Sequence, residues 1–245
     1  RIRNATGNGM SEVLRHAMSD TTIIIPQRGH AELTRECLAT LRQQERVPWP
    51  VVVVDDGTPQ AAAELHVEEY FPAQVCRQPR RGVSAAWNRG AQLAETPFLV
   101  FLNNDTRTGG PWVDELVRPL RRGECVMAGV GTRYERGLPT GLLEELPVRT
   151  FLQGWCFAIA EAVFCRLGGF DNSLRVYWSD TDLQLRAVNS ADGNQRQLLR
   201  EVAGLPLVHL GHRTAHDRRY LAHQREQWRA DRARFVRKWQ RHTVR

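Results

Sequence analysis

Short apolar runs rich in β-branched residues alternate with helix-length amphipathic stretches along the first half of the chain. Residues 21–26 (TTIIIP) and 50–57 (PVVVVDDG) are the first two runs, and each ends at proline, aspartate or glycine. Between them, residues 32–44 carry Leu and Cys at helical spacing. Strands that are apolar throughout are typical of parallel sheets buried on both faces. The order therefore predicts a β-α-β unit.

The same alternation predicts helices over 61–70 and 83–94 and strands over 73–77 and 97–102. Because three strands end in polar turns, we expect their carboxyl ends to form a ligand crevice. The later pattern is less regular. It predicts a helix over 111–121, a strand over 126–131, a loop over 133–149, a strand or buried turn over 154–160, short helices over 161–167 and 179–187, and a final strand over 202–209.

An amphipathic helix is predicted at the C-terminal end. Leu221, Trp228 and Phe235 recur every seven residues, and Trp239 follows one turn later. Residues 213–245 hold eleven Arg or Lys against three Asp or Glu, a net charge of +8, whereas the whole chain carries +7. Three interpretations stay open: packing of the apolar stripe onto the domain, attachment to an anionic membrane surface, and contact with another domain of a longer protein.

Composition narrows the class of protein. With 245 residues, 42% of them hydrophobic, the chain can fill one sizeable core, and no apolar run approaches the roughly 20 residues that cross a bilayer. The five cysteines are scattered without a C-x-x-C pair, which favours a reducing, cytoplasmic compartment. G-x-G-x-x-G and P-loop signatures are both absent from the sequence, so dinucleotide-binding and P-loop functions lose their main support.

Carboxylates follow two of the predicted strands. Asp55 and Asp56 can accept hydrogen bonds from a nucleoside, although an ordinary turn with a helix cap has the same pattern. Asp105 suits a hard divalent cation held together with phosphates, or it is a cap. Arg81 precedes a helix N-terminus and can meet a diphosphate, or it belongs to a solvated basic turn.

A second group of candidates lies in the later half. Asp180 and Asp182 follow an aromatic pair, and burial beside Trp178 would favour a general base; the alternative is a plain helix start. His209 and His212 end the last predicted strand, where one of them can complete a metal site or both can be structural. Acceptor contacts are predicted at the flanks of the cleft, where each Trp can equally belong to the core: Gln153, Trp155 and Trp178.

Six motifs in order carry a family resemblance: IIIP at 23–26, VVDDGT at 53–58, GVSAAWNRG at 82–90, FLNNDT at 101–106, LGGFD at 167–171 and SDTDL at 179–183. Together they resemble the family 2 glycosyltransferases with a GT-A fold, especially the rhamnosyltransferase-like bacterial members. The resemblance implies an α/β, Rossmann-like fold with a mixed, mainly parallel sheet flanked by helices. It implies a donor half over 21–106 and an acceptor and catalytic half over 107–212, between an N-terminal extension (1–20) and the basic C-terminal helix (213–245).

The resemblance also implies residue roles. Asp105 would be the metal-ligating end of the D-x-D motif, His209 the late metal ligand and Asp180 the catalytic base. The sequence departs from the pattern at Asn103-Asn104-Asp105, which leaves one carboxylate, and at Ser179, where the family usually has Glu. The choices between Asp180 and Asp182 and between His209 and His212 therefore stay open. The donor-binding set implied is Pro26, Asp55, Asp56, Arg81, Asn88 and Asn104.

The implied reaction is inverting transfer of a sugar from a nucleoside diphosphate sugar, by default a UDP or dTDP sugar, to a hydroxyl of a saccharide or lipid-linked acceptor, with Mn²⁺ or Mg²⁺ as cofactor. The Q-x-x-R-W signature of processive synthases is absent from the sequence, so we expect addition of one or a few sugars. The alternatives are a non-catalytic nucleotide-binding module and a nucleic-acid-binding protein. Residues 1–212, outside the basic helix, carry a net charge of −1, so we expect no nucleic-acid partner.

Overall fold

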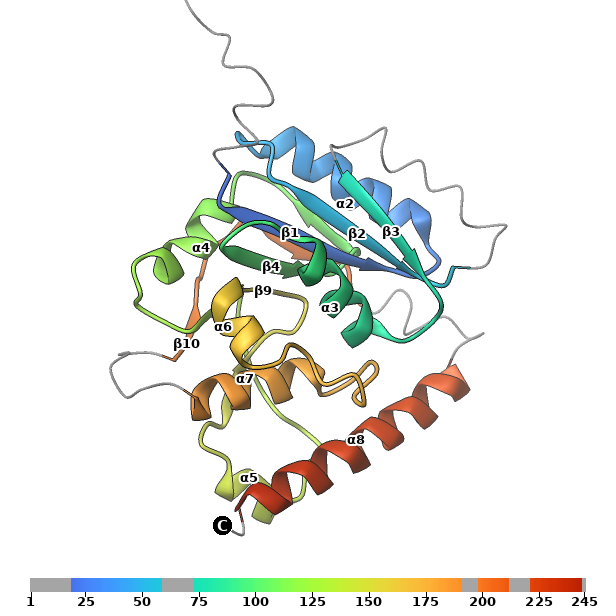
Figure 1. Ribbon diagram of the computed structural model, residues 1–245, viewed down its shortest axis with the longest axis vertical. Coiled ribbons are helices and arrows are strands. Elements are labelled where there is room, and N and C mark those ends of the chain that lie inside the picture. Colours follow the sequence, from blue (N-terminus) through green and yellow to red (C-terminus); the bar gives the residue numbers. More distant parts are fainter. Residues whose placement is uncertain (1–18, 59–72, 191–197, 212–220, 244–245) are drawn as a thin grey trace, which may run out of the picture.

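A seven-stranded sheet forms the centre of the molecule in the computed structural model, which describes residues 19–58, 73–190, 198–211 and 221–243 (Figure 1). The predicted helix over 61–70, most of the N-terminal extension and His212 lie outside these residues. The strand order is β10-β6-β9-β4-β1-β2-β3. The strands are β1 (Thr21–Gln27), β2 (Val51–Asp56), β3 (Ala73–Gln78), β4 (Phe98–Leu102), β6 (Met127–Gly129), β9 (Cys156–Ala160) and β10 (Leu199–Glu201).

Only β9 runs against its neighbours, antiparallel to both β4 and β6, and the other pairings of this sheet are parallel. The predicted mixed, mainly parallel sheet is thus confirmed. β1 is central and buried along almost its whole length, which explains why its sequence is apolar without alternation.

Helices cover both faces of the sheet. Ile23 and Ile25 of β1 point to one face, where α2 (Ala31–Gln44) and α4 (Val113–Arg121) pack. Ile24 points to the other face, which is covered by α3 (Val83–Leu93), α6 (Glu161–Arg166) and α7 (Ser179–Asn189). Successive strand side chains point to opposite faces, so one β-branched run anchors both layers.

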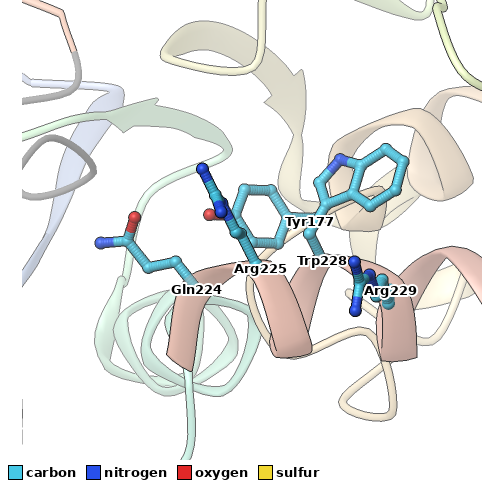
Figure 2. A pocket seen from close by; sticks show the side chains of 5 residues that line it. All are labelled: Tyr177, Gln224, Arg225, Trp228 and Arg229. Carbon is cyan, nitrogen blue, oxygen red and sulfur yellow. The ribbon is translucent and has the colours of Figure 1, made fainter. Parts of the chain in front are cut away.

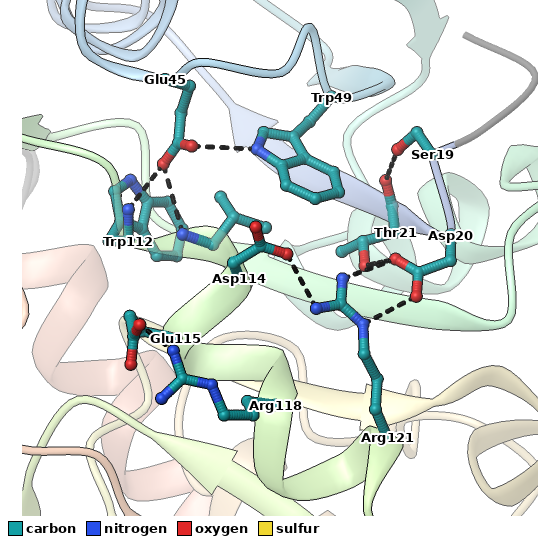
Figure 3. Close-up of polar contacts among 11 residues, drawn as sticks. Ser19, Asp20, Thr21, Glu45, Trp49, Trp112, Asp114, Glu115, Arg118 and Arg121 are labelled. Carbon is teal, nitrogen blue, oxygen red and sulfur yellow. Dashed lines mark hydrogen bonds and ion pairs between the residues drawn. The ribbon is translucent and has the colours of Figure 1, made fainter. Parts of the chain in front are cut away.

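Glu45, directly after α2, ties two parts of the first layer together (Figure 3). Its Oε1 accepts hydrogen bonds from the backbone N–H groups of Trp112, at 2.8 Å, and Val113, at 3.2 Å. Its Oε2 accepts one from Nε1 of Trp49, at 3.0 Å. The N-cap residue of α4 makes no side-chain cap of its own, so a carboxylate from another element satisfies these N–H groups and complements the helix dipole.

Two small antiparallel sheets lie beside the main one. β5 (Thr106–Thr108) pairs with β11 (Leu207–His209), and β7 (Thr132–Tyr134) pairs with β8 (Thr150–Leu152). The prediction of a loop over 133–149 was wrong in part, because β7 extends into it and α5 (Thr140–Glu145) lies within it. The strand predicted over 202–209 was right only at its end: β11 covers 207–209, whereas residues 202–206 form no strand. Strands of three residues are too short to show a period in the sequence.

The C-terminal helix α8 (Leu221–Thr243) lies along one side of the molecule, next to α5 and α7 (Figure 1). Phe235 and Trp239 are buried in a cluster with Trp178 and Leu185, so the interpretation that the stripe packs onto the domain is confirmed for these two rings. Trp228 is an exception, with 37% of its surface exposed. Over the described residues, we find no helix with the length and apolarity that crossing a membrane requires.

Candidate active site

A cleft of about 770 Å³ opens at the carboxyl edge of the sheet, where β1, β2 and β4 end. Because parallel strands end at the same edge, residues that are far apart in sequence meet there. Nine of the residues proposed from the sequence line this cleft: Pro26, Asp56, Asn104, Asp105, Gln153, Trp155, Trp178, Asp180 and His209.

The carboxylate of Asp56 shapes the turn that leads into α3. Its Oδ1 accepts hydrogen bonds from the backbone N–H of Arg81, at 2.7 Å, and from Nε2 of Gln78, at 2.9 Å. Its Oδ2 accepts one from the N–H of Gly82, at 2.8 Å. Asp55 does not line the cleft; its Oδ1 accepts from Nε2 of Gln27 at 3.4 Å. Both carboxylates therefore hold turns, and only Asp56 also faces the cleft.

Asp105 and His209 meet through the pairing of β5 with β11, which places His209 opposite Thr106. Nε2 of His209 lies 2.9 Å from Oδ1 of Asp105. The imidazole also stacks on Trp155, with ring centroids 4.9 Å apart and planes 5° apart. One ring nitrogen and one carboxylate oxygen thus lie within hydrogen-bonding distance of each other on the cleft wall.

This pair has the chemistry of a partial metal site. Carboxylate oxygens suit Mn²⁺ and Mg²⁺, and imidazole nitrogen is a common ligand of transition-metal ions. In the part of the chain that the structure describes, no third His, Cys, Asp or Glu completes a cluster with them. A cation held here would consequently take most of its ligands from diphosphate oxygens and water.

Asp180 lies in the first turn of α7, on the wall of the same cleft. Its Oδ2 accepts a hydrogen bond from Nη2 of Arg133 at 2.7 Å. The close approach of Gly154 leaves no room for a side chain, because a Cβ built there would lie 2.1 Å from that oxygen. The carboxylate is therefore held between a guanidinium and bare backbone.

Backbone strain adjoins this carboxylate. Trp178, the N-cap residue of α7, has φ 67° and ψ −4°, a left-handed conformation that L-residues other than glycine rarely adopt. Such a residue costs on the order of 1 kcal/mol or more, and surrounding packing must hold it. Trp178 packs against Phe235 and Trp228, at centroid distances of 5.4 and 6.0 Å. Helix α8 thus stabilises the turn that points Asp180 toward the cleft.

Arg133 and Glu135 are cleft residues that the sequence analysis missed. Nη2 of Arg133 lies 2.7 Å from Oε1 of Glu135 as well as from Asp180. Burial raises the pKa of Glu135, and the Asp180 charge adds to this although Arg133 opposes it. Burial alone would lower the pKa of Arg133, but the two carboxylates outweigh it and raise that pKa. Their spacing could have indicated this, because Arg133 and Glu135 are two residues apart at the end of β7 and alternate residues of a strand share a face.

Asp182, the sequence-based alternative to Asp180 as base, does not line the cleft. Its side chain is fully buried, outside the cleft lining. Nε of Arg186 and Nζ of Lys238 each lie 2.8 Å from its carboxylate, and Nε1 of Trp239 donates to it at 3.0 Å. Three donors and full burial leave it no access to an acceptor hydroxyl. It joins α7 to α8 instead.

Besides Asp55, two more residues of the predicted donor set, Asn88 and Arg81, lie outside the cleft lining. Nδ2 of Asn88 donates to the carbonyl of Phe170 at 2.9 Å, and its Oδ1 accepts from the N–H of the same residue at 2.8 Å. Asn88 therefore holds a loop rather than facing the cleft. Arg81 contributes its backbone N–H to Asp56, while Arg80 and Arg28 line the cleft.

The comparison with known sequences decides the family. The profile of glycosyl transferase family 2 matches residues 22–175, which contain most of the cleft. The chain belongs to this family. Among its relatives, the O-antigen biosynthesis protein RfbC of Myxococcus xanthus is 27% identical over 198 residues, which cover 67% of this chain and 16% of the relative. The pre-mycofactocin glycosyltransferase of Mycobacterium tuberculosis is 30% identical over 103 residues, 40% of this chain and 20% of that enzyme.

Solved structures confirm the GT-A fold of this family 2 chain. The mannosyltransferase PcManGT of Pyrobaculum calidifontis, in complex with GDP-Man and Mn²⁺, superposes with a TM-score of 0.56 at 20% identity, over 75% of this chain and 55% of that one. GalNAc-T7 with UDP, GalNAc and Mn²⁺ superposes with a TM-score of 0.56 at 16% identity, over 76% of this chain and 44% of that one. The chain thus spans about half the length of these enzymes and 16% of RfbC.

Proposed function

We propose that this protein transfers a sugar, with inversion, from a nucleoside diphosphate sugar to a hydroxyl of a saccharide or lipid-linked acceptor, with the help of a divalent cation. One observation carries the proposal: in a family 2 chain, Asp105, His209 and Asp180 line the same cleft. Asp105 and His209 are suited to binding a cation together with a diphosphate. Asp180 is suited to act as general base toward the acceptor hydroxyl. UDP and dTDP sugars are the first donors to try.

The donor would lie at the carboxyl ends of β1, β2 and β4. Asp56 and the backbone beside Pro26 line this end of the cleft and would contact the nucleoside. Arg28 and Arg80 also line it, and guanidinium groups bind phosphate oxygens well. The fit of the Asp105 carboxylate to Mn²⁺ or Mg²⁺, with an imidazole beside it that suits a transition metal, supports a cation beside the diphosphate. When bound, it would supply positive charge to neutralise the leaving nucleoside diphosphate.

Asp180 would accept the proton of the acceptor hydroxyl as its oxygen attacks the anomeric carbon and the bond to the diphosphate breaks. Oδ2 of Asp180 accepts from Arg133, and Oδ1 makes no hydrogen bond or ion pair within the described parts of the chain. The guanidinium would thus hold the carboxylate in position, with its second oxygen facing the hydroxyl. General-base catalysis of this kind contributes about 10²–10⁴-fold to rate.

The direct test is a panel of nucleotide sugars, each with Mn²⁺ or Mg²⁺, assayed for release of nucleoside diphosphate and for transfer. Asp180→Asn should lower turnover by about 10²–10⁴-fold, because Asn cannot accept the proton. Binding of the nucleoside diphosphate, measured by calorimetry, should change little. Asp114→Asn is the matched control, since Asp114 is a surface carboxylate paired with Arg121.

Full activity in Asp180→Asn would remove Asp180 from the mechanism. Tight nucleotide binding that needs no cation, without hydrolysis or transfer of any sugar, would instead favour a non-catalytic nucleotide-binding module. A loss of activity in the Asp114→Asn control equal to that in Asp180→Asn would show that the assay reports folding rather than chemistry.

A further inference from the structure

A second hollow, of about 350 Å³, lies on α8 beside the main cleft and is lined by Tyr177, Gln224, Arg225, Trp228 and Arg229 (Figure 2). Three of these five residues, Tyr177, Gln224 and Trp228, also line the main cleft. The hollow therefore adjoins the cleft in which transfer is proposed to occur, because three side chains border both. No role was assigned to it from the sequence.

A buried carboxylate fixes the segment that carries Tyr177 to α8. Asp231 of α8 is fully buried. Its Oδ2 accepts hydrogen bonds from the N–H groups of Val176, at 3.0 Å, and Tyr177, at 3.1 Å, and its Oδ1 accepts one from Arg175, at 3.2 Å. Three consecutive backbone groups are thereby fixed to α8. Tyr177 and Trp228, which are far apart in sequence, are thus held on one hollow.

Two aromatic rings and two cations share this space. Figure 2 shows the Arg225 and Trp228 side chains extending from α8 near the ring of Tyr177. Trp228 is 37% exposed, although large aromatic side chains tend to be buried. Within the described part of the chain, the guanidinium groups of Arg225 and Arg229 make no ion pair or hydrogen bond. Elsewhere on α8, Arg234 and Lys238 pair with carboxylates.

We propose that this hollow is an acceptor subsite for a sugar ring that carries an anionic group, a carboxylate or a phosphate. The aromatic faces of Trp228 and Tyr177 would pack against the ring, as amphipathic aromatic side chains do at binding sites. Arg225 and Arg229 would bind the anionic group through their paired N–H donors. The proposal rests on the proposed sugar transfer, since it assigns the hollow to the acceptor of that reaction.

The test measures binding of small saccharides to the full chain without donor, cation or transfer. Saturation-transfer NMR would compare a neutral methyl glucoside with methyl glucuronide, which carries a carboxylate, and with glucose 6-phosphate. We expect the anionic probes to bind about three- to tenfold more tightly, because each exposed ion pair contributes roughly a factor of 1.5 to 5. The preference should shrink at high salt. The anionic probe that binds more tightly shows whether the hollow prefers a carboxylate or a phosphate.

The double variant Arg225→Gln with Arg229→Gln should lose this preference, and Trp228→Ala should weaken binding of all three probes. Arg237→Gln with Arg241→Gln is the matched control: it removes the same charge from exposed positions of the same helix, away from the hollow. Gln keeps good helix propensity, so α8 should persist in both. Equal binding of neutral and anionic probes, or equal loss in the control, would overturn the proposal. Failure of the transfer reaction would appear separately, as absence of nucleotide-sugar turnover in the unmodified protein.

Discussion

Replacing Gly154 by alanine tests how closely the position of Asp180 determines turnover. The added Cβ would lie 2.1 Å from Oδ2 and 2.7 Å from Cγ of Asp180. Since nonbonded heavy atoms pack about 3.5 Å apart, the oxygen must retreat by roughly 1.4 Å. Arg133 holds that oxygen at 2.7 Å, so the retreat also breaks or distorts this ion pair.

A misplacement of about 1 Å in a reacting group can cost on the order of 10²-fold in rate. We therefore expect Gly154→Ala to lower the turnover number by about 10²-fold while the affinity for nucleoside diphosphate stays near that of the unmodified protein. The assay is steady-state release of nucleoside diphosphate with saturating donor, together with calorimetric binding. Gly141→Ala is the control, since nothing lies within 4 Å of a Cβ at this exposed helical position.

Turnover of Gly154→Ala within twofold of the unmodified protein would refute the reasoning. Either Asp180 would then have moved without effect, or it would not be the base. A thermal melt of each variant separates these outcomes from simple unfolding.

Three further variants address other parts of the molecule. Asp182→Asn should lower the free energy of unfolding by roughly 1–3 kcal/mol in a urea titration, because it weakens the bonds that Arg186, Lys238 and Trp239 make to a fully buried carboxylate. Burial opposes ionisation of Asp171, but its bond to Lys238 prevails and lowers its pKa to about 2. The unmodified protein should therefore melt at a higher temperature than Asp171→Asn above about pH 4. This difference in melting temperature should vanish as the pH falls to about 2. His209→Ala should weaken Mn²⁺-dependent nucleotide binding by about tenfold or more, because it removes the imidazole that contacts Asp105. Nucleotide binding that does not depend on a cation should stay unchanged.

In the described part of the first half, the order of strands and helices was predictable because each element is long enough to show its period. The β1 run is apolar on both sides since both faces of the central sheet are covered, and α2 shows its buried stripe in Cys37, Leu38 and Leu41. The cleft position of Asp56 and Asp105 followed from the rule that parallel strands end together. These are consequences of local pattern and connectivity.

The later half was less predictable. The strands β7, β10 and β11 have three residues each, so they exist only through their partners. The choice between Asp180 and Asp182 could not be made from the sequence, because both lie in the first turn of one helix. Burial distinguishes the two residues: Asp182 packs against α8, and Asp180 faces the cleft.

By itself, then, the sequence determined the three-layer α/β framework, the turns that supply Asp56 and Asp105, and the basic, amphipathic end of the chain. Only the tertiary structure decided that Arg133 engages Asp180 and that Trp228 leaves the apolar stripe to line a hollow. Periodicity reports which side of an element is buried. It carries no information on which distant element provides the burial or the counter-charge, because those contacts depend on how separate segments pack.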